Sequence, residues 1–160
     1  MTDVVLPRSR SAQEPYSYRT DATVPAFPDD KPIIIFDGHC VLCSGFARFV
    51  LKHDKRATIR LMAGQSPLGQ ALYRHLGLDS TDFQTNILLC RGRAWFKSRG
   101  TIRMFQLLGF PWSASVLLRI IPTPLLDRLY SWIARNRLRW FGRQDQCFVA
   151  DPAQRDRFLG

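Results

Sequence analysis

The hydrophobic and polar positions of the chain become regular only after Pro32. Residues 33–36 are Ile, Ile, Ile and Phe, an apolar run of the length of a buried strand. Asp37 and Gly38 end that run, and over residues 42–50 apolar side chains recur at the spacing of one helix face. The pattern predicts a strand, a tight turn and a helix.

The same two periodicities continue along the rest of the chain. Further strands are predicted over residues 58–62, 86–90 and 94–97, the last two joined by a hairpin turn. Helices are predicted to begin at Pro67, Ser98, Trp112 and Pro124, the first of them ending at Gly77 and the last near Arg139. The order β-α-β-α-β-β-α, followed by extra C-terminal helices, predicts an α/β protein with a thioredoxin-like core.

The two ends of the chain lack such periodicity. Residues 1–32 hold five of the ten prolines, which predicts a flexible N-terminal extension, with a docking segment as the alternative. Residues 33–150 are predicted to form one thioredoxin-like domain, including the C-terminal helices. Residues 151–160 are predicted to be a tail.

Composition and charge narrow the class of protein. Hydrophobic residues make up 46% of the 160 residues, as in an ordinary globular domain, and the formal net charge is +10. No stretch has the apolar run of a signal peptide or of a membrane-spanning helix. Four cysteines do not make a disulfide-stapled secreted domain of this size. We therefore expect a cytoplasmic protein.

The segment 128–143 concentrates the positive charge. It contains five arginines, no acidic residue, and the two tryptophans Trp132 and Trp140. Such a segment would suit nucleic acid or an anionic membrane surface. The alternative is an ordinary solvated helix face whose arginine stems and tryptophans pack on the core.

The candidate chemistry lies in the Cys-x-x-Cys pair of Cys40 and Cys43, at the start of the first predicted helix. Backbone N–H groups in a first helical turn favour a thiolate, so the pKa of Cys40 should lie below the free-thiol value of about 8.5. Cys40 would attack a disulfide, and Cys43 would resolve the mixed disulfide. A pair of this kind near a strand–helix–strand pattern indicates a thioredoxin-like redox site.

Two other interpretations of the cysteine pair were weighed. Structural zinc needs four ligands, usually as two close pairs, whereas Cys90 and Cys147 stand far apart, so we expect no metal. The pair would be inert in a deep core, but the polar turn over residues 37–39 argues that this end of the helix lies outside it. Cys90 is expected in the core, and Cys147 is either a small buried residue or a third redox thiol.

These residues resemble a known family, the DCC proteins, which are predicted thiol-disulfide oxidoreductases. The first block of the resemblance is Asp-Gly-His-Cys-Val-Leu-Cys at residues 37–43, and the second is residues 130–143 followed by Cys147. The resemblance spans roughly residues 33–149. It implies a thioredoxin-like fold and places three residues at the site, namely Asp37, Cys40 and Cys43.

The sequence departs from the thioredoxin pattern in one respect. Thioredoxins have a cis-proline before the third strand, whereas residues 83–85 fill that stretch here without one. We assign substrate contacts to Thr85, in that stretch, and to His39. Asp37 would cap the helix or accept a proton from the resolving thiol. A charged His39 would lower the pKa of the nucleophilic thiol, and a neutral exposed imidazole is the alternative.

The function predicted from the sequence is therefore thiol–disulfide exchange with a protein or low-molecular-weight thiol partner, without a cofactor. Two alternatives stay open. One is a basic binding module for nucleic acid or an anionic membrane surface, with structural thiols. The other is a regulator whose partner binding is switched by the disulfide.

Overall fold

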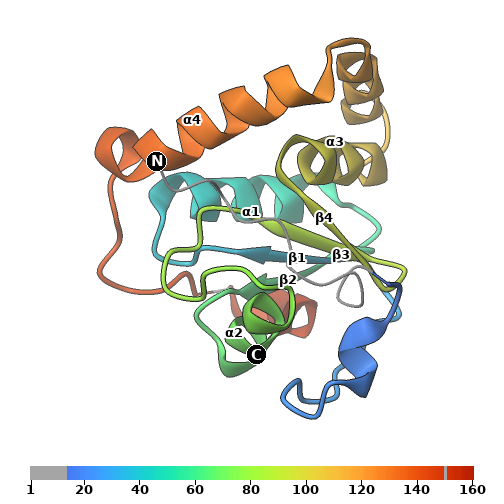
Figure 1. Ribbon diagram of the computed structural model, residues 1–160, viewed down its shortest axis with the longest axis vertical. Helices are drawn as coiled ribbons and strands as arrows, with labels where there is room; N and C mark the ends of the chain where they lie inside the picture. Colours follow the sequence, from blue (N-terminus) through green and yellow to red (C-terminus); the bar gives the residue numbers. More distant parts are fainter. Residues whose placement is uncertain (1–13, 150) are drawn as a thin grey trace.

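The computed structural model describes residues 14–149 and 151–160, and the order of its core elements is the predicted one (Figure 1). The core elements are β1 (Ile33–Phe36), α1 (Val41–His53), β2 (Arg60–Ala63), α2 (Pro67–His75), β3 (Ile87–Cys90), β4 (Arg93–Phe96) and α3 (Lys97–Leu107). The remaining elements are the 3-10 helices η2 (Ser17–Thr20), η3 (Trp112–Ile120) and η4 (Pro152–Arg157), the long helix α4 (Thr123–Phe141) and the short strand β5 (Phe158–Leu159). The α/β, thioredoxin-like prediction is confirmed.

The five strands form one mixed sheet in the order β4-β3-β1-β2-β5. β1 lies at its centre, parallel to β2 and antiparallel to β3. A central strand is covered on both faces, which explains why residues 33–36 are all apolar and all buried. The turn after β1 therefore leaves the middle of the sheet.

The two faces of the sheet hold separate cores. Ile33 and Ile35 of β1 belong to the core under α2, whereas Ile34 and Phe36 belong to the core under α1 and α3. Figure 1 shows α1 and α3 on one side of the sheet and α2 on the other. The alternation of successive side chains along β1 thus supplies both cores, each buried side chain contributing about 1.5–3 kcal/mol.

The helix ends agree with the sequence signals in α2 and differ in α3. Ser66 caps α2 by accepting a hydrogen bond from the backbone N–H of Gly69 at 3.1 Å, and the left-handed Gly77 follows the helix as predicted. Ser98, where this helix was predicted to begin with a serine cap, lies inside the first turn of α3, and the N-cap residue is Phe96. The Ser98 hydroxyl instead donates to Asp127 of α4, so it ties two helices together.

Both ends of the chain differ from the prediction in their described parts. Residues 1–13 of the predicted extension lie outside the described residues, but Tyr18 and Val24 are buried in the core under α2. The Tyr18 ring stacks on Phe27 with the centroids 5.3 Å apart. Of the predicted tail, residues 158–159 form β5, which pairs with β2. Single buried side chains and a strand of two residues produce no periodic pattern in the sequence, so the prediction missed them.

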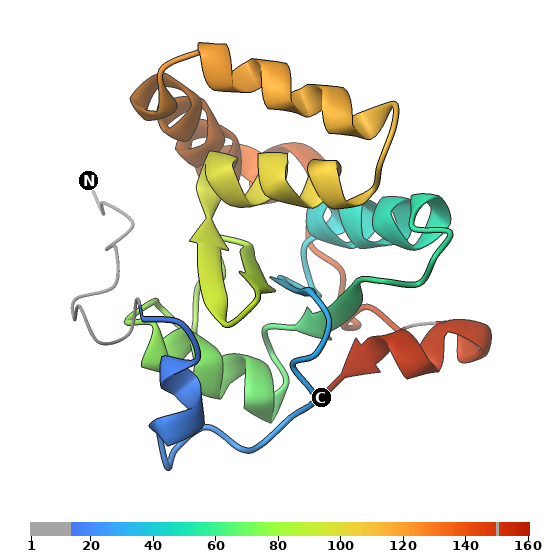
Figure 2. The same ribbon diagram turned by 90° about the vertical axis from the view of Figure 1, so that its right-hand side faces the viewer.

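Helix α4 lies across α1 and α3, outside the layer that covers the sheet (Figures 1 and 2). Leu129 of α4 is 51% exposed, whereas Ala134 and Arg137 are buried. The preceding helical segment, η3, is a 3-10 helix. Across the two described ranges, no helix has the length and apolar character needed to cross a bilayer.

Candidate active site

The two cysteines lie where the sequence placed them, at the first turn of α1. Cys40 is the N-cap residue, and its Sγ accepts a hydrogen bond from the backbone N–H of Cys43 at 3.4 Å. Both thiols are free. A sulfur in the position of a capping side chain satisfies one of the unpaired N–H groups at the helix end, which also favours its charged form.

The pKa values of the two thiols are shifted in opposite directions. The hydrogen bond donated by the Cys43 side chain, together with the backbone N–H of Cys43 and the nearby charge of Arg137, lowers the pKa of Cys40 to about 6. Burial and Asp37 act in the other direction. Donation of that same hydrogen bond, and then burial, raise the pKa of Cys43. These opposite shifts favour a thiolate on Cys40 and a protonated thiol on Cys43 at a pH above about 6.

A buried ion pair lies next to the thiols. Arg137 of α4 donates from Nη2 to Asp37 Oδ2 at 3.1 Å and to the carbonyl oxygen of Phe83 at 2.9 Å. Arg137 and Asp37 are 3% and 5% exposed. Such a pair is held in place by its hydrogen bonds, since neither charge can reach bulk water. The positive charge therefore stays near both sulfurs.

The other carboxylate oxygen of Asp37 orders the turn before Cys40. It accepts from the backbone N–H of His39 at 3.0 Å and from Gln65 Nε2 at 2.7 Å, while Gln65 Oε1 accepts from the N–H of Gly38 at 3.0 Å. The helix cap itself is the Cys40 sulfur. The prediction that Asp37 caps the helix is wrong, because Asp37 caps the turn before it. Its other predicted role, as proton acceptor for the resolving thiol, stays a prediction.

The segment 142–148, which we call the strap, covers this turn. Its backbone forms hydrogen bonds on both sides of Cys40. Before Cys40, Gln144 N–H donates to His39 O at 2.7 Å and Phe148 N–H donates to Gly38 O at 2.9 Å; after it, Gly142 O accepts from the N–H of Val41 at 3.4 Å. As a result Cys40 has no exposed surface. The sequence argument that this end of the helix lies outside the core is wrong, because a segment distant in sequence buries it.

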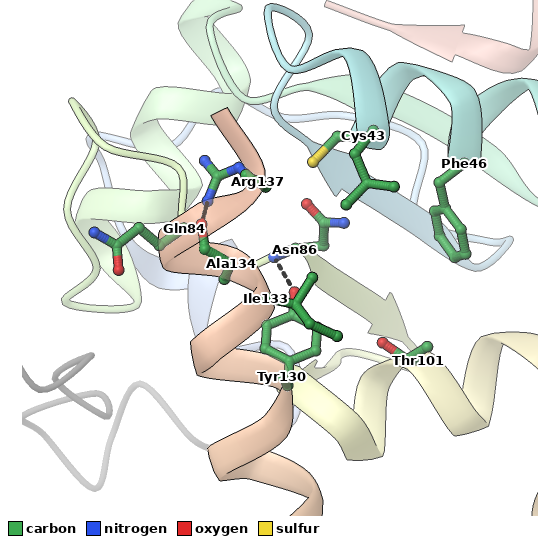
Figure 3. A pocket seen from close by; sticks show the side chains of 10 residues that line it. Cys43, Phe46, Gln84, Asn86, Thr101, Tyr130, Ile133, Ala134 and Arg137 are labelled. Atoms are coloured by element: carbon green, nitrogen blue, oxygen red, sulfur yellow. Dashed lines mark hydrogen bonds between the residues drawn. The ribbon is translucent and has the colours of Figure 1, made fainter. Parts of the chain in front are cut away.

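Cys43 faces a different environment. It is 6% exposed and lines a pocket of about 190 Å³ between α1 and α4. The pocket wall combines apolar side chains, including Leu42 and Phe46, with polar ones, including Tyr130 and Arg137. Figure 3 shows the Cys43 sulfur directed toward the part of the pocket where Arg137 lies. A small apolar group can therefore approach the resolving thiol.

Comparison with known proteins assigns the chain to a family. Residues 34–143 match the family model described as DCC1-like thiol-disulfide oxidoreductase. The chain belongs to this family. It is 36% identical over 127 residues to the YuxK protein of Bacillus subtilis (strain 168), described as uncharacterized, covering 79% of this chain and 93% of that protein. It is 34% identical over 120 residues to a DCC family protein of Arabidopsis thaliana, described as chloroplastic, covering 74% and 70%. No solved structure matches.

The two predicted substrate contacts differ in their burial in this DCC1-like protein. His39 is half-buried beside the cysteines, and its Nδ1 lies 3.1 Å from the carbonyl oxygen of Gln144 in the strap. Thr85 is buried, its carbonyl accepts from Tyr73 at 2.6 Å, and its hydroxyl has no hydrogen-bond partner. The structure thus brings His39 to the thiols and leaves Thr85 under the surface.

The remaining cysteines of this family member lie in β3 and in the strap. Cys90 is buried in β3, as predicted. Cys147 is half-buried in the strap, burial raises its pKa, and its Sγ lies so close to Gly38 that a side chain at Gly38 would collide with it. Within residues 14–149 and 151–160, no cluster of three His, Cys, Asp or Glu side chains could hold a metal ion.

Arg137 is the site residue that the sequence analysis missed, because it was read as one of five arginines in a basic run. A signal was present. Tyr130, Ala134 and Arg137 recur at the spacing of one helix face, and all three line the pocket. An arginine on the inward face of an amphipathic helix needs a buried acceptor, and Asp37 and the Phe83 carbonyl provide it.

Proposed function

We propose that the protein exchanges thiols and disulfides with a protein or low-molecular-weight partner, with Cys40 as the nucleophile and Cys43 as the resolving thiol. The observation that supports this most is the hydrogen bond onto Cys40 Sγ at the helix N-cap. It favours a thiolate on Cys40 at neutral pH while Cys43 keeps its proton. Membership in a thiol-disulfide oxidoreductase family gives the same reaction class.

The proposed exchange proceeds in two balanced steps. The Cys40 thiolate attacks one sulfur of a substrate disulfide, forming a mixed disulfide and expelling the other substrate sulfur as a thiolate, which takes the Cys43 proton. The Cys43 thiolate then attacks Cys40 Sγ, forming the intramolecular disulfide and releasing the second substrate thiolate. Two electrons pass from the protein to the substrate, and the reverse sequence oxidises a dithiol.

The ion pair of Arg137 and Asp37 has a positioning role in this proposal. The Arg137 charge stabilises whichever of the two sulfurs is ionised, and Asp37 holds the guanidinium in place. Three donors already occupy the Asp37 carboxylate, namely Arg137, Gln65 and the backbone N–H of His39. We therefore propose this positioning role for Asp37 in preference to base catalysis.

The approach of the substrate requires a movement of the strap over residues 142–148. Cys40 is fully buried, so a substrate sulfur reaches it only when the backbone hydrogen bonds to Gly38 and His39 open. His39 then borders the exposed sulfur and is the proposed substrate contact, while contact with Thr85 stays a prediction. We propose a cytoplasmic setting, where thiols are kept reduced and the resting form is the dithiol.

A thiol count across a series of glutathione redox buffers tests the proposal. Reduced protein is equilibrated in each buffer, free thiols are tagged and counted by mass, and Cys40→Ser, Cys43→Ser and Cys90→Ser are compared. We expect a reversible loss of two thiols in wild type and in the buried-cysteine control Cys90→Ser, and its absence in the other two variants. If no pair oxidises, or if the pair survives Cys43→Ser, the proposed exchange is refuted.

A further inference from the structure

We propose that the outer face of α4, together with the adjoining end of η3, binds the surface of an anionic phospholipid bilayer with the helix lying parallel to it. This surface is on the side of α4 that faces away from α1 and α3. In Figures 1 and 2, η3 and α4 lie at the same end of the molecule, beyond the helices that cover the sheet. The proposal does not depend on the chemistry of the thiols.

One half of this outer face is apolar and exposed. Leu125 is 57% exposed, Leu129 and Trp132 are each 51% exposed, and Trp140 is 47% exposed. The rings of Trp132 and Trp140 lie 4.8 Å apart between centroids, so they form one continuous apolar patch. A face of this kind exposes more large side chains than the isolated ones found on most soluble surfaces.

The end of η3 extends the apolar half beyond the helix. Ile120 is 83% exposed and Leu117 is 65% exposed, and the turn at Pro122 joins them directly to α4. These are aliphatic side chains with no group that can form a hydrogen bond. Water contact with them costs about 25 cal/mol for each Å² of apolar surface, and a bilayer interface would remove that contact.

The other half of the face is basic, and in the part of the chain that the structure describes no acidic side chain neutralises its charge. Arg128, Arg135 and Arg139 are exposed, recur at one-face spacing, and have no carboxylate partner among the described residues. Asp127, the acid of α4, points inward and accepts from Ser98. Three unpaired guanidinium groups beside exposed tryptophans and leucines are the pattern of a helix at a membrane interface.

The aliphatic part decides between lipid and nucleic acid. Arginine and tryptophan alone would also fit a single-stranded nucleic acid, where bases stack on the rings. Ile120, Leu117 and Leu125 gain nothing from a phosphate backbone and would stay in water beside it. At a bilayer they enter the boundary between headgroups and acyl chains, while the arginines meet lipid phosphates. The observations therefore favour the bilayer.

Vesicle co-sedimentation tests the proposal on the full chain. The protein is incubated at low salt with vesicles of phosphatidylcholine alone, or with equal parts of phosphatidylglycerol. We expect binding to the anionic vesicles that falls as salt screens the charges. Because each arginine near an anionic surface favours binding several-fold, Arg128→Gln, Arg135→Gln and Arg139→Gln together should weaken it on the order of a hundredfold.

A matched control removes the same charge elsewhere. Arg56→Gln, Arg74→Gln and Arg91→Gln together change three exposed arginines outside α4 and should weaken binding much less. A second variant, Leu125→Ser with Leu129→Ser, keeps every charge and should still lose most of the binding. Circular dichroism checks that each variant is folded.

Three outcomes would overturn the proposal. Absence of binding to anionic vesicles by folded wild type is the first. Equal losses for the two triple-arginine variants would show a general charge effect without a defined face. Tighter binding of a fluorescent single-stranded oligonucleotide than of vesicles, abolished by the α4 variant, would assign the face to nucleic acid instead. Cys40→Ser should bind vesicles like wild type, which separates this result from any failure of the redox proposal.

Discussion

Replacing Cys43 by alanine removes the side-chain donor that contributes most to the low pKa of Cys40. Folding lowers that pKa from its ordinary value of 9.0 to about 6, a change of three units, which corresponds to about 4 kcal/mol between the two protonation states. The backbone N–H of residue 43 and the Arg137 charge remain in the variant. We therefore expect only part of the shift to disappear, with the pKa of Cys40 rising by about 1–2 units.

The thiolate absorbance of the reduced protein, followed against pH, measures this change. The curve of the matching Cys40→Ser protein is subtracted, so that the remaining signal belongs to Cys40 alone. Cys43→Ser is the control, because its hydroxyl can still donate to Cys40 Sγ and should preserve more of the shift than alanine. If the pKa of Cys40 stays near 6 in Cys43→Ala, the hydrogen bond between the thiols is not the source of its acidity.

The same pKa difference makes the stability of the reduced protein depend on pH. Because folding lowers the pKa of Cys40, its thiolate stabilises the folded state fully above about pH 9, and this contribution is lost as pH falls through about 6. The free energy of unfolding should therefore rise between these values, by at most about 4 kcal/mol. Cys43, whose pKa is raised, opposes this trend only above its unfolded value of 9.0. Urea unfolding at several pH values, with Cys40→Ser as the flat control, would show the slope or contradict it.

Three further predictions concern close contacts inside the protein, two of them at the site and one at the far end of α1. Arg137→Met should lower the free energy of unfolding by about 3–5 kcal/mol, because it leaves a buried carboxylate without its partner; a loss below about 1 kcal/mol in urea unfolding would contradict the pairing. Arg157→Met should cost about 3 kcal/mol in the same assay, since Arg157 Nη2 lies 2.5 Å from the buried Asp54. Gly38→Ala should lower the melting temperature through the contact with Cys147, and Cys147→Ala in the same chain should restore part of it.

The sequence predicted the core because its signals there are local. The apolar run before Asp37, the proline that begins α2, and the cysteine spacing at α1 each occupy a few neighbouring residues. Each of them also agrees with the global fold. A central strand must be apolar on both faces, and a helix that leaves it must begin with a group that accepts from free N–H donors.

The parts that the sequence did not predict depend on contacts between distant segments. Arg137 is one hundred residues from Asp37, and nothing in the spacing of either residue identifies its partner. The burial of Cys40 is set by the strap over residues 142–148, whose hydrogen bonds use backbone groups and leave no mark in the side-chain pattern. β5 is only two residues long, too short for a sequence pattern, and its pairing with β2 appears only in the structure.

The position of Arg137 explains why the second block of the DCC resemblance, far from the cysteines in sequence, belongs to the same site. The inner face of α4 supplies Arg137 to the thiols and Tyr130 to the pocket, and the chain that leaves α4 at Gly142 becomes the strap over Cys40. The outer face carries the exposed arginines and tryptophans half a helical turn away. A rigid helix separates the two sets of side chains, so changes on the outer face leave the ion pair to Asp37 intact. Attachment through that face would thus hold the protein at a surface while the thiols react on the opposite side of the helix.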